Sequence, residues 1–411
     1  MGFVTDSLHK GVRHEKNSDA TLPPICQVSA FGFQDMETLE DVFNGKAAGF
    51  AYTRIGNPTV AAFEQRISAL EHGFGAVATS SGMAAISQAL LNFLSTGDEI
   101  IASGGLYGGT IQLFTLFRQL GITVHYANDL SSSVLEKILT PNVKAVFAEV
   151  ISNPALKITD LKSLADFCHS HSLPLLVDST TATPFLVNPI DFGADIVIHS
   201  SSKYINGTSN SISGVIIDSG KFDWDFDRYP ALKAYSKFKK MAYLMRLRKD
   251  SWASLGGCLS PFNAYMNIIG LETLGLRMER ICNNAHKLAL ALSKIPGTNV
   301  NYPLLGIEND EQNSLCKTQL KGFGGGILTL RTGSREKTFK TINSLKLATV
   351  ASNIGDVRTL VIAPAKTLYL HNTEEEMHAA GVYEDTIRVS VGIEDAEDLI
   401  EDFTQALKSA L

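Results

Sequence analysis

The chain has 411 residues, of which 45% are hydrophobic and 19% are charged, so we expect two domains with well-buried cores. Its 36 Lys and Arg against 42 Asp and Glu give a net charge of −6, which does not favour nucleic acid or an anionic membrane surface as a partner. No apolar run approaches the roughly 18 residues of a bilayer span, and the first residues lack the apolar segment of a secretion signal.

The first 55 residues have no regular hydrophobic rhythm and contain Pro23 and Pro24, so we expect an irregular arm over residues 1–55. From about residue 75 to 218, short β-branched runs alternate with helix-period segments. The predicted strands are EIIAS, ITVHYA, VKAVFAEV, PLLVDST, DIVIHSS and GVIID, and the helices between them include TIQLFTLFRQLG, SSSVLEKIL and LKSLADFCHS. This alternation predicts βαβ units around a mostly parallel sheet, in a domain that we assign to residues 56–250.

Residues 222–250 are charged and aromatic, and we expect them to form an excursion leading into one long helix, PFNAYMNIIGLETLGLRMERICNNAHKLALALS. A smaller α/β unit follows, with predicted strands GGILTLRT, TLVIAP and TIRVSVG and a closing helix DAEDLIEDFTQALKSAL. We assign residues 251–411 to this C-terminal domain. The stretch GFGGG at 322–326 has the composition of a phosphate loop, but it precedes a strand, so we interpret it as structural.

The five cysteines are scattered and include no Cys-x-x-Cys pair. Their odd number and wide spacing indicate neither a disulfide framework nor a zinc site, and they fit a reducing cytoplasm. One short cluster, CHSH at residues 168–171, contains metal-ligand types, but histidines two apart on a helix do not share a face. We expect no metal site and a cytoplasmic location.

Ligands of parallel sheets bind beyond the carboxyl ends of the strands, and in this chain polar residues such as Asn153 and Asp178 follow predicted strands. The sharpest segment is IVIHSSSKYINGTSNSISG, in which Lys203 follows a strand and lies close to Ser200 and Ser202. A lysine can form a Schiff base, a carboxylate can keep a ring nitrogen protonated, and hydroxyls can bind a phosphate. The combination indicates a pyridine cofactor, pyridoxal phosphate.

Other segments supply further groups for the same cofactor. In ATSSGMAAI a Ser-Ser-Gly turn opens a helix, so the amides of Gly82 and Met83 point toward an anion, as the helix dipole favours. AYTRIGNPT provides the guanidinium of Arg54 and the phenol of Tyr52. Tyr107 follows the strand EIIAS and provides a ring that can lie over a planar cofactor.

These segments, in this order, resemble the Cys/Met-metabolism family of pyridoxal-phosphate enzymes. The similar segments are AYTRIGNPT, SSGMAAI, LYGGT, ISNP, VDSTTATP, HSSSKYINGTSNSISG and TIRVSVGIE, which extend over nearly the whole chain. Within the family, LSPFNAYMNIIGLETLGLRMER and SNIGDVRTLVIAPA are most similar to O-acetylhomoserine sulfhydrylases. The resemblance implies a fold-type I transferase, with a mostly parallel sheet in the large domain and a smaller C-terminal α/β domain.

The resemblance also implies a role for each candidate residue. Lys203 is implied to be the Schiff-base lysine and the catalytic base, and Tyr107 to stack on the ring and assist at the leaving group. Cofactor contacts are implied for Asp178, Asn153, Gly82, Met83, Ser200 and Ser202, together with Tyr52 and Arg54 from a neighbouring subunit of a homotetramer built as a dimer of dimers. Arg388 is implied to bind the substrate carboxylate with help from Asn353.

The chain departs from the family pattern near the cofactor at Ser179, Thr181, Thr208 and Ser213, and it has Gly109 where some eliminating relatives have cysteine. We expect γ-replacement, in which O-acetylhomoserine, an amino-acid substrate, and a sulfur donor give homocysteine and acetate, as in methionine biosynthesis. A γ- or β-lyase acting on methionine, cystathionine or cysteine is an alternative, and a non-catalytic binding protein is a third. The acyl group and the donor, whether sulfide, a small thiol or a protein carrier, stay open.

Overall fold

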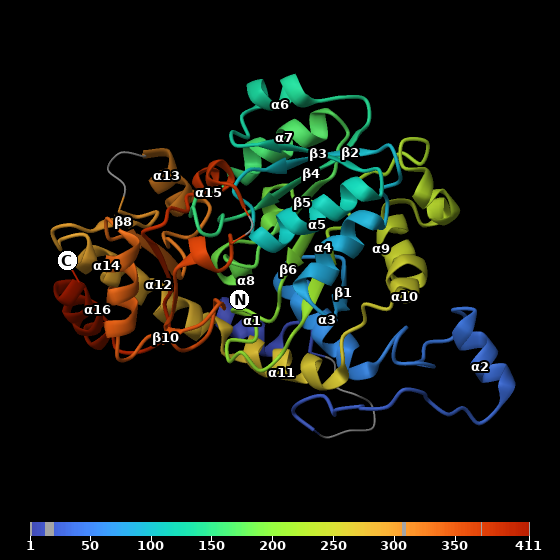
Figure 1. Ribbon diagram of the computed structural model, residues 1–411. Helices are drawn as coiled ribbons and strands as arrows, with labels where there is room; N and C mark the ends of the chain where they lie inside the picture. The colour runs from blue at the N-terminus through green and yellow to red at the C-terminus, as the bar shows by residue number, and fades with distance from the viewer. Residues whose placement is uncertain (1, 13–19, 306–309, 371, 411) are drawn as a thin grey trace.

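The computed structural model describes residues 2–12, 20–305, 310–370 and 372–410, which fold around two separate β-sheets (Figure 1). The larger sheet has seven strands in the order β1-β7-β6-β5-β4-β2-β3. These strands are β1 (Gly75–Thr79), β2 (Glu99–Ser103), β3 (Thr123–Ala127), β4 (Val143–Glu149), β5 (Leu175–Asp178), β6 (Ile196–His199) and β7 (Gly214–Asp218). Strands β2 to β6 are parallel, and β7 is antiparallel to both neighbours. The predicted mostly parallel sheet is confirmed.

Both faces of this sheet are buried, because successive strand residues enter two different apolar layers. The helices that cover it include α3 (Pro58–Leu70), α4 (Gly82–Leu91), α5 (Gly108–Gln119), α6 (Ser132–Ile138), α7 (Leu161–Ser170) and α8 (Thr183–Leu186). On β4, Phe147 belongs to the layer formed with α4 and α5. Its neighbours Val146 and Ala148 belong to the layer formed with α3 and α7.

The N-terminal segment divides into a docked helix and an extended arm. Helix α1 (Phe3–His9) packs against the large domain, where the ring of Phe3 lies edge-on to the ring of Phe185. Residues 20–57 instead lead away from the sheet and carry α2 (Met36–Phe43) at the far end of the arm (Figure 1). The irregular arm expected over residues 1–55 therefore begins only after a docked helix.

The excursion after β7 contains η2 (Pro230–Met241), α9 (Ala242–Arg246), η3 (Leu247–Ser251) and α10 (Trp252–Leu255). The single long helix predicted beyond it is wrong, because α11 (Pro261–Glu272) and α12 (Leu274–Leu292) are separated at Thr273. Within α11, Gly270 lies so close to the Ile205 carbonyl that a Cβ there would collide with it. The bend keeps α11 on the large sheet while α12 continues to the smaller sheet.

The same region bears on the division into domains. Trp252 lies in the core layer beneath α4, and Ile268 and Leu271 of α11 lie in the layer beneath α3. Packing therefore favours a division within α12 over the expected one at residue 250, and we propose that later position.

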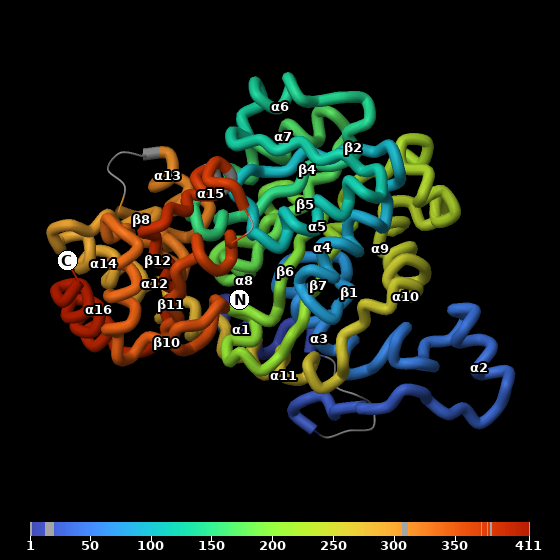
Figure 2. Tube along the Cα trace, viewed as in Figure 1, coloured from blue at the N-terminus to red at the C-terminus, as the bar shows by residue number. Residues whose placement is uncertain are grey.

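The smaller sheet has five mainly antiparallel strands in the order β10-β11-β12-β9-β8. Its strands and helices are β8 (Asn299–Asn301), α13 (Asp310–Thr318), β9 (Ile327–Arg331), α14 (Arg335–Ser344), β10 (Thr349–Val350), β11 (Leu360–Ile362), η4 (Pro364–Lys366), α15 (Glu374–Ala379), β12 (Thr386–Ser390) and α16 (Ala396–Ala410). Helix α16 lies on the outer side of this sheet (Figure 2). Ile387 and Val389 pack with α12 and α16, so strand alternation directs Arg388 to the opposite face.

The glycine-rich stretch before β9 has a packing role, as expected. A Cβ on Gly324 would lie 2.7 Å from the Tyr302 ring, and one on Gly326 would lie 2.5 Å from Ile281. Glycine is needed here for close approach. None of the helices in the described part of the chain has the length and apolar character that crossing a bilayer would require.

Candidate active site

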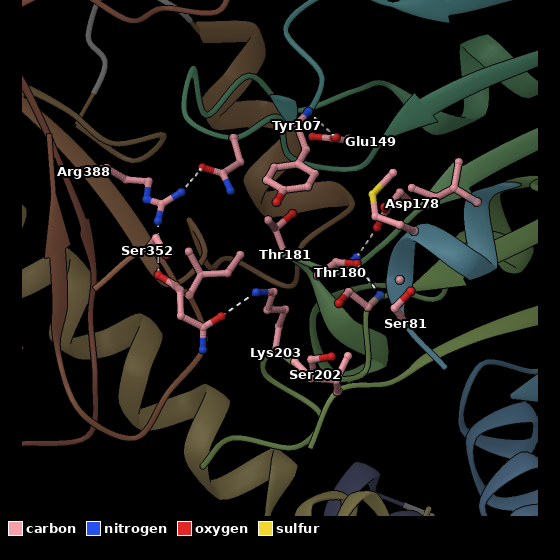
Figure 3. Close-up of a pocket in the computed structure, with 18 residues that line it drawn as sticks. Ser81, Tyr107, Glu149, Asp178, Thr180, Thr181, Ser202, Lys203, Ser352 and Arg388 are labelled. Atoms are coloured by element: carbon pink, nitrogen blue, oxygen red, sulfur yellow. Dashed lines mark hydrogen bonds between the residues drawn. The ribbon is translucent and has the colours of Figure 1, made fainter. Parts of the chain in front are cut away.

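A cleft of about 220 Å³ opens at the carboxyl ends of β4, β5 and β6, where ligands of parallel sheets are expected. It brings together ten of the twelve predicted site residues: Gly82, Met83, Tyr107, Asn153, Asp178, Ser200, Ser202, Lys203, Asn353 and Arg388. Figure 3 shows side chains from both sheets facing one another across this space. The cleft therefore joins groups that are far apart in the sequence.

Lys203 lies in the turn that follows β6, and its amine donates a hydrogen bond to Oδ1 of Asn353 (Figure 3). Burial and the positive charge of Arg388 lower the pKa of Lys203 to about 8. Both effects disfavour the protonated amine. The lowered pKa therefore increases the fraction of the amine that is neutral near neutral pH, and the neutral amine is the form that acts as a nucleophile or base.

Two carboxyl groups end neighbouring strands beside this amine. Asp178 on β5 and Glu149 on β4 are paired in register, and an oxygen of Asp178 accepts from the Thr180 amide at 2.9 Å. Burial raises the pKa of Asp178, and hydrogen bonds from Thr180 partly offset this. Burial, and next the charge of Asp178, raise the pKa of Glu149 well above its usual value. The pKa of Glu149 is thus raised further than that of Asp178, so Glu149 favours its protonated form more strongly.

Sequence reasoning missed Glu149, although it follows the apolar run VKAVFA just as Asp178 follows LLV. Glu149 accepts a hydrogen bond from the Tyr107 amide at 2.7 Å, which ties β4 to the start of α5. Sequence reasoning also missed His199, which ends β6 and pairs with Glu71. Both side chains of this pair are fully buried. When protonated, His199 favours the ionised form of Asp178.

The first turn of α4 forms an anion cradle. Gly82 and Met83 are the first two residues of the helix, so their amides have no acceptor within it, and the Ser81 hydroxyl caps the amide of Ala84 at 3.1 Å. A Cβ at Gly82 would lie 2.6 Å from the Cβ of Ser200, so only glycine leaves the space open. Amide donors, a nearby hydroxyl, an amine and a carboxylate form the donor set that pyridoxal phosphate requires.

Ser202 lines the same cleft, but its hydroxyl is already engaged. It donates to the Ser213 carbonyl at 3.0 Å and accepts from the Ser213 amide at 2.8 Å. The Ser213 hydroxyl, at a position where the family usually has glycine, accepts from Ser201 at 2.9 Å and from Asn267 at 2.8 Å. This departure from the family pattern is therefore accommodated behind the cleft and not within it.

Arg388 is a buried cation at the opposite wall. It is 3% exposed, and its guanidinium donates to Asn153 Oδ1 at 3.3 Å and to the Asn353 carbonyl at 3.1 Å. Burial lowers its pKa to about 10, so it stays charged at neutral pH. No carboxylate of the described residues pairs with it. A buried guanidinium without a counter-ion is a binding site for an anionic group.

Residues 4–408 match the family of Cys/Met metabolism PLP-dependent enzymes. The chain belongs to this family. It is 41% identical to a homocysteine synthase of Schizosaccharomyces pombe, over 99% of this chain and 98% of that one. It is 37% identical to an L-methionine gamma-lyase of Fusobacterium nucleatum subsp. polymorphum, over 99% and 98%.

A solved structure is also similar to this chain. A Campylobacter jejuni protein assigned as an O-acetylhomoserine (thiol)-lyase matches with a TM-score of 0.93 and 32% identity, over 99% of this chain and 100% of that one. That structure contains N'-pyridoxyl-lysine-5'-monophosphate. The predicted family, fold class and cofactor are confirmed, and the protein is a pyridoxal-phosphate enzyme.

Two predicted cofactor residues do not reach the cleft within one chain of this enzyme. Arg54 donates to the Ala253 carbonyl, and its guanidinium lies 5.6 Å from the centre of the Tyr52 ring. Both belong to the arm, and neither lines the cleft. Tyr107, in contrast, precedes α5 and projects its ring into the cleft above Thr181 (Figure 3).

The remaining departures from the family pattern lie at different depths. Thr181 lines the cleft and donates to the Ile151 carbonyl at 2.9 Å, whereas Ser179 is fully buried and Thr208 is exposed. A Cβ at Gly109 would lie 2.5 Å from the Tyr107 ring, so a cysteine there would displace the ring. Among the described residues, no group of three or more His, Cys, Asp or Glu is arranged to hold a metal ion.

Proposed function

We propose that this enzyme catalyses γ-replacement, in which O-acetylhomoserine and a sulfur nucleophile give homocysteine and acetate. The Cγ–O bond breaks with its electron pair on acetate, and a Cγ–S bond forms to the nucleophile. The observation that carries the proposal is the 41% identity to a homocysteine synthase over 99% of the chain. The cleft supports it with a buried guanidinium for a carboxylate and an amine of lowered pKa for proton transfer.

Pyridoxal phosphate, when bound, withdraws electrons from the amino acid and makes its α-hydrogen acidic. The residues that would hold it are Gly82 and Met83 at the phosphate, with Ser200 beside them, and Asp178 at the ring nitrogen. Asp178 suits this task because the pKa of its neighbour Glu149 is raised further, which favours Asp178 as the carboxylate that pairs with a protonated ring.

The remaining roles follow from the two walls of the cleft. Arg388 binds the substrate carboxylate and thereby fixes the amino acid relative to Lys203. The Lys203 amine, neutral in part near neutral pH, removes a proton at Cα and returns one to the carbon chain. Tyr107 covers the cleft at the side of the leaving group, where the hydrogen bond that its backbone amide donates to Glu149 holds it in place.

We further propose that the site is shared between subunits of a homodimer that pairs into a tetramer. The arm carries five exposed large apolar side chains, which in a monomer would face water: Ile25, Val28, Met36, Phe43 and Tyr52. An exposed apolar segment of this kind favours contact with a second copy. Such a contact would bring Tyr52 and Arg54 to a neighbour's phosphate. The five unpaired cysteines support a cytoplasmic location.

Elimination by a lyase is the second candidate, favoured by the 37% identity to a methionine gamma-lyase and by the uncommon Thr181 in the cleft. The deciding experiment incubates the purified holoenzyme with O-acetylhomoserine and sulfide and quantifies homocysteine and 2-oxobutanoate. We expect homocysteine to predominate. Predominant 2-oxobutanoate, or rapid turnover of methionine or cystathionine alone, would assign a lyase. Replacing sulfide by a small thiol, and acetyl by succinyl, then defines the donor and the acyl group.

A further inference from the structure

The side chain of Asn353 lies in a chain of hydrogen bonds that begins at the catalytic amine and leaves the cleft. Lys203 Nζ donates to Asn353 Oδ1, and Asn353 Nδ2 donates to the Ser209 hydroxyl at 2.8 Å. The Ser209 hydroxyl in turn donates to Oδ2 of Asp356. The chain joins the loop after the lysine to the segment that precedes β11.

The buried end of this chain is an ionised carboxylate. Asp356 is 2% exposed, and Arg358 donates to its two oxygens at 2.9 and 3.1 Å. Burial opposes the charge, but the hydrogen bonds from Arg358 and Ser209 outweigh it and hold the pKa of Asp356 below its usual range. An ionised carboxylate accepts hydrogen bonds and donates none.

This acceptor fixes the direction of every bond in the chain. Because Asp356 only accepts, Ser209 must use its single hydroxyl hydrogen there, and the lone pairs of Ser209 remain to accept from an NH₂ group. Asn353 therefore turns its nitrogen to Ser209 and its oxygen to Lys203. If the amide were flipped, the Asn353 NH₂ group would face the Lys203 amine, so that two donors would oppose each other. The Asn353 oxygen would then face the Ser209 oxygen, whose hydrogen is already donated to Asp356. The orientation follows from the network and does not depend on telling oxygen from nitrogen by shape.

The backbone around Ser209 is held in place by further contacts. Ser209 has φ 57°, a left-handed conformation that is strained for a residue with a side chain. The Val357 amide donates to the Gly207 carbonyl at 2.8 Å, so the loop after the lysine is joined to the segment around Asp356 at two points. The strained residue is thus retained where its hydroxyl bridges the two segments.

We propose that Ser209 and Asp356 are positioning residues that keep the acceptor oxygen of Asn353 directed at the amine of Lys203. The side-chain amide of Asn353 then accepts a hydrogen bond from the catalytic base, Lys203. The guanidinium of Arg388, which donates to the backbone carbonyl of Asn353, binds the substrate carboxylate. The inference deepens the proposed function, because Lys203 is the base of that reaction. The orientation and the labelling test described below do not depend on the identity of the substrate.

The test compares Ser209→Ala with Thr208→Ala, which removes an exposed hydroxyl from the adjacent residue. In full-length protein freed of cofactor and checked for its fold by circular dichroism, acetic anhydride labels Lys203 between pH 6 and 11. Mass spectrometry of the Lys203 peptide then gives the pKa of this amine. The groups that face it, Arg388, Asp178, Glu149 and Tyr107, are the same in all variants.

We expect Ser209→Ala to lower this pKa by about 0.5 or more, a roughly threefold change, because the protonated amine loses its fixed acceptor. Thr208→Ala should leave it unchanged. In the Asn353→Asp background an acceptor faces the lysine in either orientation, so adding Ser209→Ala should no longer lower the pKa. In Asp356→Asn the new amide can donate to Ser209, which permits the Asn353 amide to reverse. This variant should shift the pKa of Lys203 in the same direction as Ser209→Ala.

The holoenzyme provides a second readout. Ser209→Ala should reduce kcat about tenfold and change the KM for O-acetylhomoserine less than threefold, because Arg388 is untouched. Equal Lys203 pKa values in the Ser209 and Thr208 variants would overturn the proposal. A rise in KM alone, with the pKa unmoved, would also overturn it and would assign the Asn353 amide to the carboxylate. A shifted pKa in an enzyme that makes no homocysteine would refute the proposed function and leave this inference intact.

Discussion

Arg388→Lys tests whether the buried guanidinium is the carboxylate anchor. Arg388 uses its Nη1 and Nη2 atoms on Asn153 and on the Asn353 carbonyl, at 3.3 and 3.1 Å, and its remaining N–H groups are available to a ligand. Lysine keeps the charge but offers no planar fork, so one charge-assisted hydrogen bond to the carboxylate is lost. Such a bond contributes about 1.5–3 kcal/mol, which predicts a roughly 10- to 100-fold rise in the KM for O-acetylhomoserine at about 1.4 kcal/mol per tenfold.

Steady-state kinetics with both substrates varied measures this effect, and the sulfur donor is the internal control. The KM for sulfide and the cofactor spectrum should be unchanged, because neither involves a carboxylate at Arg388. Arg388→Gln should also raise the pKa of Lys203 above about 8, since the positive charge that disfavours the protonated amine is removed. If Arg388→Lys leaves the amino-acid KM unchanged, or raises the KM values of both substrates equally, the guanidinium does not bind the carboxylate.

Three further predictions concern the cofactor site, the subunit arm and the core. Glu149→Gln should keep cofactor affinity and activity within about threefold, because glutamine mimics the protonated carboxyl and still accepts from the Tyr107 amide. Glu149→Ala should reduce both quantities tenfold or more. Equal losses in the two variants would contradict this prediction. Lys203→Ala should lose the absorbance of the covalently bound cofactor and should lose turnover. Refolding this variant together with inactive Arg54→Ala should restore about a quarter of wild-type activity if sites are shared between subunits. No recovery would exclude the contribution of Arg54 to a neighbouring subunit's site. Burial raises the pKa of Asp218 to about 7, so folding favours its protonated form, and stability should fall by up to about 4 kcal/mol as pH rises from 4 to 8. Urea unfolding of Asp218→Asn, which can still accept from the Gly220 amide, should have a flatter pH dependence, and an unchanged slope would argue against this assignment.

The elements around the site could be predicted from the sequence because their signals are local. Apolar runs of four to eight residues separated by helix-period segments specify parallel strands, and the polar residue after each run lies at the ligand-binding edge. Asp178 and Lys203 were found in this way, and Glu149 follows the same rule. In β12, the alternation that buries Ile387 and Val389 already places Arg388 on the other face of its strand.

The tertiary structure alone decided how these groups act on one another. Whether Glu149 or Asp178 keeps a proton depends on burial and on strand register, and the orientation of the Asn353 amide depends on a carboxylate buried elsewhere in the same domain. The break at Thr273 and the close contact between Gly270 and the Ile205 carbonyl are likewise seen only in the folded chain. Sequence patterns report how a segment divides its residues between core and solvent, whereas charge, hydrogen-bond direction and close contact are properties of pairs that only folding brings together.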